Sequence, residues 1–281
     1  MLRLAVAQTA PVARAVAANA ARIDALAASV RADLMLTPEL SLTGYDVGDS
    51  VHTLARRMLP FDHFDPVLQS RGALVVGVIE AAAGGPFNTA TVLQDGVVLF
   101  RHRKIYLPTY GMFDEARWFG RGTALETFTT VGGWRVGILI CEDFWHPGLV
   151  YVLAAARRID VLLVQAAAPG RGVWSGGEHG AFASATVWER MVRTTAQLFG
   201  IYVALANRVG VEGGVTFAGG SIIAAPDGAL LARAPDAGEE VIMAECTRDA
   251  LRRAHTPYAH ARDDDPLLVL RELDRALEEQ R

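Results

Sequence analysis

A strand–helix–strand pattern occurs twice in this sequence and limits the fold more than any other feature. In the first copy, a strand predicted at Leu2–Gln8 is followed by a helix from about Val16 to Arg31 and by a strand that starts at Asp33. The second copy joins a strand at Val136–Ile140 to one at Val161–Gln165 through a helix between them. Strands that alternate with helices are typical of parallel α/β units. We therefore predict an α/β fold with two similar halves.

Further strands are predicted between and after these two units. Apolar runs bounded by turn residues indicate them. They lie at Leu74–Glu80, Thr89–Gln94, Val97–His102, Ile201–Ala206, Ser221–Ala225, Ala229–Arg233 and Glu240–Glu245. We expect the last four of these strands to close the second sheet, behind a long helix predicted at Glu178–Phe199.

Length and composition favour one large soluble domain, which we assign to residues 1–262. The chain of 281 residues carries 27 basic and 31 acidic residues, and the basic ones are scattered, which argues against a nucleic-acid partner. The apolar runs fall well short of the roughly 18 residues that a membrane span needs. Two cysteines, Cys141 and Cys246, do not indicate a disulfide framework, so a cytoplasmic location is expected.

Residues 263–281 predict a separate amphipathic helical tail. The segment begins with three aspartates and continues with Leu267, Leu270, Leu273 and Leu277. Negative charge favours a helix start, and the leucine spacing produces one apolar stripe. This stripe needs a partner surface, which could be the body of the same subunit or a neighbouring subunit.

Cys141 directly follows the apolar strand Val136–Ile140. Open α/β folds place ligands and chemistry at this edge of the sheet, because the turn and the helix start that follow offer free backbone donors. Unpaired cysteine is also among the most buried residue types. From this position alone, a core cysteine and a nucleophile are equally compatible with the sequence.

Three ionisable residues stand at comparable places: Glu39 after Thr37-Pro38, Lys104 after a predicted strand, and Glu115 in a loop at 107–122. A cysteine nucleophile needs a base for its proton and a positive group for the oxyanion. Glu39 could be that base and Lys104 that cation. Each residue also has a structural alternative, because Glu39 could cap a turn, Lys104 could be a surface residue, and Glu115 could form an ion pair with a nearby arginine.

Other catalytic or metal sites fit the sequence less well. His146 is close to Cys141 in sequence, whereas the histidine of a cysteine protease is usually distant in sequence, so it is a minor candidate. Glu142, Asp143 and His146 are too compact for a metal site, and no HExxH or paired-cysteine motif occurs. We therefore predict no metal site.

Four short motifs in order, TPEL, RKIYLP, FDE and LICEDFW, resemble the nitrilase or carbon–nitrogen hydrolase superfamily. The match runs from residue 1 to about residue 245. YLPTYGMFDEARWF and FAGGSIIAAPDGALLARAP are most similar to the glutamine-hydrolysing domain of glutamine-dependent NAD synthetases. The resemblance implies an α-β-β-α sandwich that forms four layers and assembles into a homodimer or a higher homo-oligomer.

The resemblance also implies a mechanism and a set of site residues. Glu39, Lys104, Glu115 and Cys141 would be catalytic, and the backbone N–H of Glu142 would help to hold the oxyanion. A small amide would be hydrolysed through a cysteine thioester, with release of ammonia or an amine and without a metal or organic cofactor. Aromatic residues could line the substrate pocket, namely Tyr45, Phe113, Trp145 and Trp174.

Two departures from the synthetase pattern bear on the substrate. The sequence contains no SGGxDS motif of an ATP-binding domain, so NAD synthesis by this chain alone is not expected. Residues 165–169 read QAAAP where relatives often carry Asn and Ser, which favours a less polar amide than glutamine. Alternatives are a nitrilase, an N-carbamoyl amide hydrolase, a non-catalytic binding subunit, and an ammonia-supplying partner of a separate synthetase.

Overall fold

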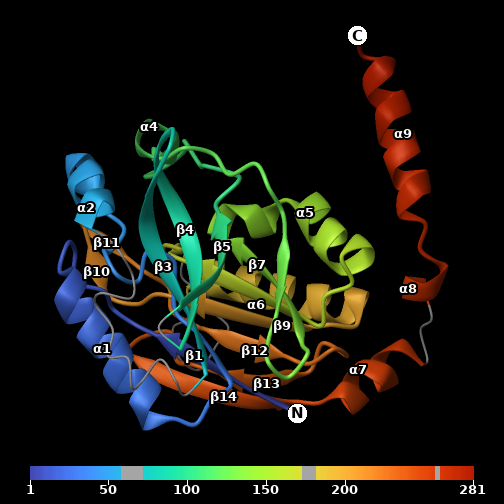
Figure 1. Ribbon diagram of the computed structural model, residues 1–281, viewed down its shortest axis with the longest axis horizontal. Helices are drawn as coiled ribbons and strands as arrows, with labels where there is room; N and C mark the ends of the chain where they lie inside the picture. Colours follow the sequence, from blue (N-terminus) through green and yellow to red (C-terminus); the bar gives the residue numbers. More distant parts are fainter. Residues whose placement is uncertain (58–71, 96, 173–181, 257–259) are drawn as a thin grey trace.

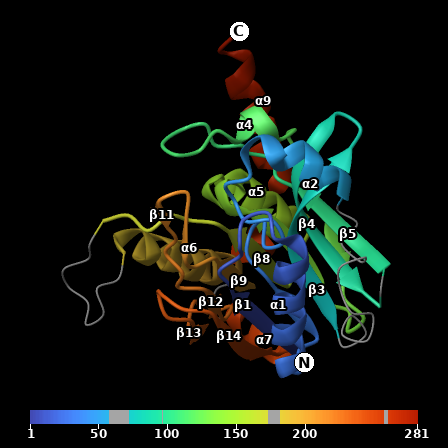
Figure 2. The ribbon, with the colours of Figure 1, turned by 90° about the vertical axis from the view of Figure 1, so that its left-hand side faces the viewer.

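Two six-stranded sheets form the centre of the molecule in a computed structural model that describes residues 1–57, 72–95, 97–172, 182–256 and 260–281. The sheets face each other and helices lie outside them (Figures 1 and 2). This arrangement confirms the predicted α-β-β-α sandwich. None of the helices in these ranges is long and apolar enough to cross a bilayer.

The first sheet has three parallel strands at its centre and antiparallel strands on both sides. Its strands are, in spatial order, β14 (Glu240–Cys246), β1 (Leu2–Gln8), β2 (Leu34–Leu36), β3 (Ala73–Ala82), β4 (Gly85–Gln94) and β5 (Val97–Arg103). Helix α1 (Val16–Ser29) joins β1 to β2, as the first strand–helix–strand pattern predicted.

The second sheet repeats this plan. Its strands are β6 (Thr127–Thr129), β7 (Arg135–Ile140), β8 (Val161–Ala166), β9 (Tyr202–Asn207), β12 (Ile222–Ala224) and β13 (Leu230–Arg233). Here β7, β8 and β9 are the parallel strands, with one antiparallel strand on one side and two on the other. The two similar halves predicted from the sequence are therefore present.

One strand was assigned to the wrong sheet. Strand β14 was expected to close the second sheet, but it pairs with β1 in the first, from Leu2 opposite Cys246 to Gln8 opposite Glu240. Its apolar pattern predicts a strand and contains no information about the partner. Because β14 returns from the second half of the chain to pair with the first strand, it ties the two sheets together.

The core lies between the sheets, and alternate residues of β1 show how it forms. Leu4 and Val6 belong to the large cluster that fills the space between the sheets, whereas Ala5 and Ala7 pack towards α1. Alanines on that face leave room for Ile23 of the helix. The parallel strands of both sheets are buried on both faces, which explains their nearly continuous apolar sequences.

The remaining helices lie outside the two sheets, and the last three of them form the C-terminal end of the chain. They are α2 (Val51–Arg57) after the short turn η1 (Gly48–Ser50), α4 (Glu115–Trp118), η3 (Cys141–Trp145), α5 (Pro147–Tyr151) with η4 (Val152–Ala156), α6 (Ala183–Phe199), α7 (Arg248–His255), α8 (His260–Asp263) and α9 (Pro266–Glu278). The predicted start of the long helix, at residues 178–181, lies outside the described residues. A small hairpin of β10 (Val211–Glu212) and β11 (Val215–Thr216) was not predicted.

Candidate active site

Glu39 lies in the turn that follows β2, and its side chain is buried. Its carboxylate accepts hydrogen bonds from Lys104 Nζ at 2.6 Å, from Asn88 Nδ2 at 2.8 Å and from the backbone N–H of Ala167 at 2.9 Å. Three donors from three different strands or strand ends hold the carboxylate in one position. Asn88 was not singled out from the sequence, because an asparagine inside a strand carries no local signal of this contact.

The turn that carries Glu39 depends on a glycine in the neighbouring strand. Leu40 has a φ of 48°, in the left-handed region that side chains rarely adopt. A Cβ atom on Gly77 of β3 would lie 2.2 Å from the Leu40 backbone nitrogen. A larger residue at position 77 would therefore push the turn, and Glu39 with it, away from the sheet.

Lys104 follows β5 and is completely enclosed between two carboxylates. Its Nζ lies 2.6 Å from Oε1 of Glu39 and 2.6 Å from Oε1 of Glu115. Burial lowers the pKa of Lys104, but Glu115 and Glu39 outweigh burial and hold the pKa well above its ordinary value. Lys104 is therefore a fixed cation, and the alternative of a surface lysine is wrong.

Glu115 begins α4 and is 3% exposed. Its Oε1 accepts hydrogen bonds from Lys104 and from the hydroxyl of Tyr45, whereas its Oε2 has no partner among the described residues. Burial raises the pKa of Glu115 to about 7, and Glu39 contributes to the increase while Lys104 opposes it. The structural alternative for Glu115 was an ion pair with a nearby arginine. Its partners are instead Lys104 and Tyr45.

Cys141 is buried at the end of β7 and opens the turn η3 with a φ of 46°. Burial raises the pKa of its thiol well above the usual value, and the charges of Glu39 and Glu115 raise it further. Lys104 and the backbone N–H of Ala167 act in the opposite direction. The resting thiol is therefore protonated, so a nucleophile at this position needs a neighbouring base. The structure thus brings together the four residues predicted as catalytic.

Asp143 joins the turn of Cys141 to the segment that carries Lys104. Its buried carboxylate accepts from the backbone N–H groups of Ile105 at 3.0 Å, Tyr106 at 2.8 Å and Ile140 at 3.2 Å, and lies 3.1 Å from Nε2 of His102. Sequence analysis considered Asp143 only as a metal ligand and missed this role. The available signal was an acidic residue within three positions of the strongly apolar strand β7.

Polar side chains also gather around Tyr110, beside the turn of Cys141. The Tyr110 hydroxyl donates to Oε2 of Glu142 at 2.6 Å, and His146 stacks on Tyr106 with ring centroids 3.4 Å apart. A Cβ on Gly111 would lie 2.9 Å from Nη2 of Arg171, which places that guanidinium next to the Tyr110 loop. We call Tyr106, Tyr110, Glu142, His146 and Arg171 the rim cluster. Glu142 was predicted to contribute only its backbone, but its side chain belongs to this cluster.

The four aromatic residues expected in the pocket have different surroundings. Tyr45 contacts Glu115 through its hydroxyl, and Phe113 packs edge-on against the Tyr45 ring at 5.9 Å. Trp145 is half exposed and packs edge-on against Trp188 at 5.6 Å. Trp174 lies outside the described residues. Tyr45 and Phe113 are thus next to the catalytic cluster, whereas Trp145 packs mainly against α6.

Comparisons with known proteins identify the family of this chain. The family model of carbon–nitrogen hydrolases matches residues 3–256. The glutamine-dependent NAD(+) synthetase of Xanthomonas campestris is 32% identical over 277 residues, which cover 94% of this chain and 47% of the synthetase. The chain thus spans less than half the length of this curated relative.

Two solved structures extend the comparison. The glutamine-dependent NAD+ synthetase of Acinetobacter baumannii, in complex with ADP, superimposes with a TM-score of 0.79 at 28% identity, over 89% of this chain and 46% of that one. A variant of the amidase from Nesterenkonia sp. AN1, with acrylamide added to its active-site cysteine, gives a TM-score of 0.70 at 26% identity, over 90% and 96%. The chain belongs to the carbon–nitrogen hydrolase family.

Proposed function

We propose that this protein hydrolyses the C–N bond of a small linear amide through a thioester on Cys141 and releases ammonia or an amine. The observation that carries the proposal is the buried network of Glu39, Lys104 and Glu115, with two bonds of 2.6 Å to one cation, beside a buried cysteine at a strand end. A network of charges that only stabilised the fold would have no need of a thiol beside it. Hydrolysis through a cysteine needs a base for the thiol proton and a cation for the oxyanion, and this network supplies both.

In the first half-reaction, Glu39 accepts the thiol proton while the sulfur of Cys141 attacks the amide carbon. Glu39 is assigned as the base because the backbone N–H of Ala167 bonds its Oε2 and also acts on the Cys141 thiol, which places the two groups side by side. The oxyanion is held by the Lys104 ammonium and by the backbone N–H of Glu142 at the start of η3. The proton on Glu39 then passes to the leaving nitrogen, the C–N bond breaks, and a thioester remains.

In the second half-reaction, water replaces the amine. Glu39 accepts a proton from the water, whose oxygen attacks the thioester carbon. The C–S bond then breaks, and Glu39 passes this proton to the leaving sulfur of Cys141 as the acid departs. Glu115 helps to position this water. It also keeps Lys104 in place, because Glu39 and Glu115 hold the ammonium from two sides.

Trapping the acyl group identifies the substrate class. Incubation with short aliphatic amides, glutamine, nitriles and N-carbamoyl compounds, followed by acid quenching and mass spectrometry, is expected to show an acyl adduct on Cys141 with the amides. Ammonia release should follow the same ranking. An adduct formed only from nitriles or only from carbamoyl compounds would reassign the reaction, and absence of any adduct on Cys141 with any compound would contradict covalent catalysis.

An ammonia-supplying role with glutamine as the substrate is the second candidate. It is favoured by the similarity to glutamine-dependent synthetases and by the rim cluster, where the carboxylate of Glu142 and the guanidinium of Arg171 lie near Tyr110. Groups of opposite charge suit the ammonium and carboxylate of an amino acid. Preferential acylation by glutamine in the trapping experiment would support this role over a less polar amide.

The proton on Glu115 gives the reaction a pH dependence near neutrality. We expect kcat/KM to rise as the pH increases through about 7, because ionised Glu115 pairs with Lys104. Its folded pKa exceeds the ordinary value of 4.5, so protonation of Glu115 stabilises the fold fully below pH 4.5, and this contribution is lost as the pH rises through about 7. Glu115→Gln should remove both effects.

Asp114→Asn provides the control for this pH dependence. It makes the same change of charge one residue away, on an exposed side chain that caps no helical N–H. This variant should keep the rising limb of the pH–rate profile and the pH dependence of unfolding. A limb near pH 7 that persists in Glu115→Gln would assign the ionisation to another group.

A further inference from the structure

The two proposed donors to the oxyanion come from different sheets. Lys104 directly follows β5 of the first sheet, whereas the N–H of Glu142 lies in η3, which follows β7 of the second sheet. Apolar side chains fill the space between the sheets. Apolar contacts have no preferred direction, so they hold the sheets together without fixing their edges as closely as a reaction requires. Polar contacts across the sheets are therefore the ones that can set the distance between the two donors.

The buried carboxylate of Asp143 makes such contacts. Its Oδ1 accepts from the backbone N–H groups of Ile105 at 3.0 Å and Tyr106 at 2.8 Å, the two residues that directly follow Lys104. Asp143 itself directly follows Glu142 in the chain. One carboxylate thus joins the segments that carry the two oxyanion donors.

The second oxygen of Asp143 holds the other side of both segments. Oδ2 accepts from the N–H of Ile140, directly before Cys141, at 3.2 Å. It also lies 3.1 Å from Nε2 of His102, two residues before Lys104. Since an ionised carboxylate only accepts hydrogen bonds, Nε2 carries the hydrogen of this contact. Asp143 is therefore bound to the chain before and after Lys104.

His102 reaches Asp143 from inside the sandwich. It is 2% exposed and lies opposite Ala90 of β4, whose small side chain leaves room for the imidazole. Its two arginine neighbours in β5 point to the other face of the strand. The other donors to Asp143 in the described part of the chain are backbone N–H groups. His102 is thus the donor to this carboxylate that a substitution can remove.

We propose that His102 is a positioning residue of the amide hydrolysis and that it acts through Asp143 on the oxyanion site. This inference rests on the proposed function. With the imidazole in place, the carboxylate is held on both oxygens, and the Lys104 ammonium and the Glu142 N–H keep one separation. Without it, Oδ2 is left with the N–H of Ile140, which belongs to the same sheet as Asp143, so its link to the strand before Lys104 is lost.

The kinetic signature of this role is a loss of kcat at constant KM. The oxyanion forms only in the transition states, so a displaced donor does not weaken binding of the amide itself. Both half-reactions pass through such an oxyanion and should slow together, which keeps KM unchanged. His102→Leu should lower kcat about 100-fold, the size of loss that a misplacement of about 1 Å produces, with KM within about twofold of the wild-type value.

Two polar substitutions separate the hydrogen bond from the packing of the imidazole. His102→Gln places an amide N–H near the position of Nε2 and should keep kcat within about fivefold of the wild type. His102→Asn is shorter by one methylene group and should lose kcat as His102→Leu does, and this pair gives the answer if His102→Leu fails to fold. Steady-state ammonia release with the amide that acylates Cys141 best measures kcat and KM, and circular dichroism checks the fold.

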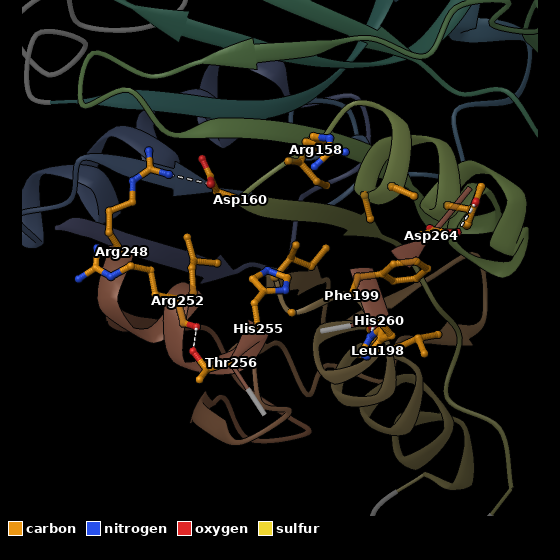
Figure 3. Close-up of a pocket in the computed structure, with 17 residues that line it drawn as sticks. Arg158, Asp160, Leu198, Phe199, Arg248, Arg252, His255, Thr256, His260 and Asp264 are labelled. Atoms are coloured by element: carbon orange, nitrogen blue, oxygen red, sulfur yellow. Dashed lines mark hydrogen bonds and ion pairs between the residues drawn. The ribbon is translucent and has the colours of Figure 1, made fainter. Parts of the chain in front are cut away.

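Arg248→Leu is the matched control, because Arg248 contacts a carboxylate at the opposite end of β7. Its Nη1 lies 2.6 Å from Oδ1 of Asp160 (Figure 3). Oδ2 of Asp160 accepts from the N–H of Arg135, the first residue of β7, at 2.8 Å. The control therefore also removes the side-chain donor of a carboxylate that holds β7, but at the end away from Cys141, and it should leave kcat and KM unchanged.

The outcomes distinguish a failure of this inference from a failure of the proposed function. A wild-type protein that forms no acyl adduct and releases no ammonia would contradict the proposed function, and the inference with it. With an active wild type, retention of kcat in His102→Leu and His102→Asn would overturn the inference alone. A rise in KM in place of the loss of kcat would also overturn it, as would an equal loss of kcat in Arg248→Leu or in His102→Gln.

Discussion

Cys141→Ala is expected to lower ammonia release from amides by about 10⁴-fold or more, because no thioester can form without the sulfur. The fold should remain intact. The substitution removes one buried atom, and alanine places no larger side chain in the turn that Cys141 occupies at a φ of 46°. Steady-state ammonia release measures the first effect, and circular dichroism with thermal unfolding measures the second.

Cys246 provides the control for this experiment. It is the second cysteine of the chain, is completely buried at the end of β14, and burial raises its pKa to about 12. Cys246→Ala should therefore lose some stability and retain activity. Full activity in Cys141→Ala would disprove the proposed mechanism, and an equal loss in both variants would attribute the effect to packing.

The sequence was sufficient to locate most elements, to place Glu39, Lys104 and Cys141 at strand ends and to place Glu115 in a loop. Apolar runs such as Val136–Ile140 have few alternatives to a buried strand, and a polar residue that follows one must lie at the sheet edge. Glu39 and Cys141 could be located in this way because each directly follows such a run or lies within a few residues of it. Lys104 and Glu115 also needed the family resemblance, since neither has a distinctive position by itself.

Features that depend on contacts between distant segments could not be predicted. The pairing of β14 with β1 joins residues more than 200 positions apart, and nothing in the pattern of either strand encodes the other. Asn88 and Asp143 were missed for the same reason, because their importance comes from the groups that they hold. Asp143 orients three backbone N–H groups from two segments, and only the fold brings these groups together.

The buried charges also explain why the site should be costly to disturb. Two carboxylates and one ammonium lie almost without solvent, so each is stable only while its partners are present. The donors from Asn88 and Ala167 support Glu39 independently of Lys104. Glu115 has one donor besides Lys104, the Tyr45 hydroxyl on Oε1, and none on Oε2 in the described part of the chain. Of the two carboxylates, Glu115 therefore depends more on the lysine.

Lys104→Met should abolish ammonia release and lower the free energy of unfolding by about 3–5 kcal/mol, the usual cost of leaving buried charges without their partner. Arg103→Met is the matched control, because Arg103 pairs with Glu80 at the partly exposed end of β5 and its loss should cost less than about 1 kcal/mol. Urea denaturation at pH 8, above the pKa of about 7 of Glu115, measures both values.

A second substitution separates the electrostatic effect from a loss of packing. Adding Glu115→Gln to Lys104→Met removes the carboxylate that depends most on the lysine, so a large part of the lost stability should return while activity stays absent. If packing of the lysine stem caused the loss, the double variant would be no more stable than the single one. A Lys104→Met protein as stable as the wild type would contradict the expectation that the buried carboxylates need the lysine as their partner.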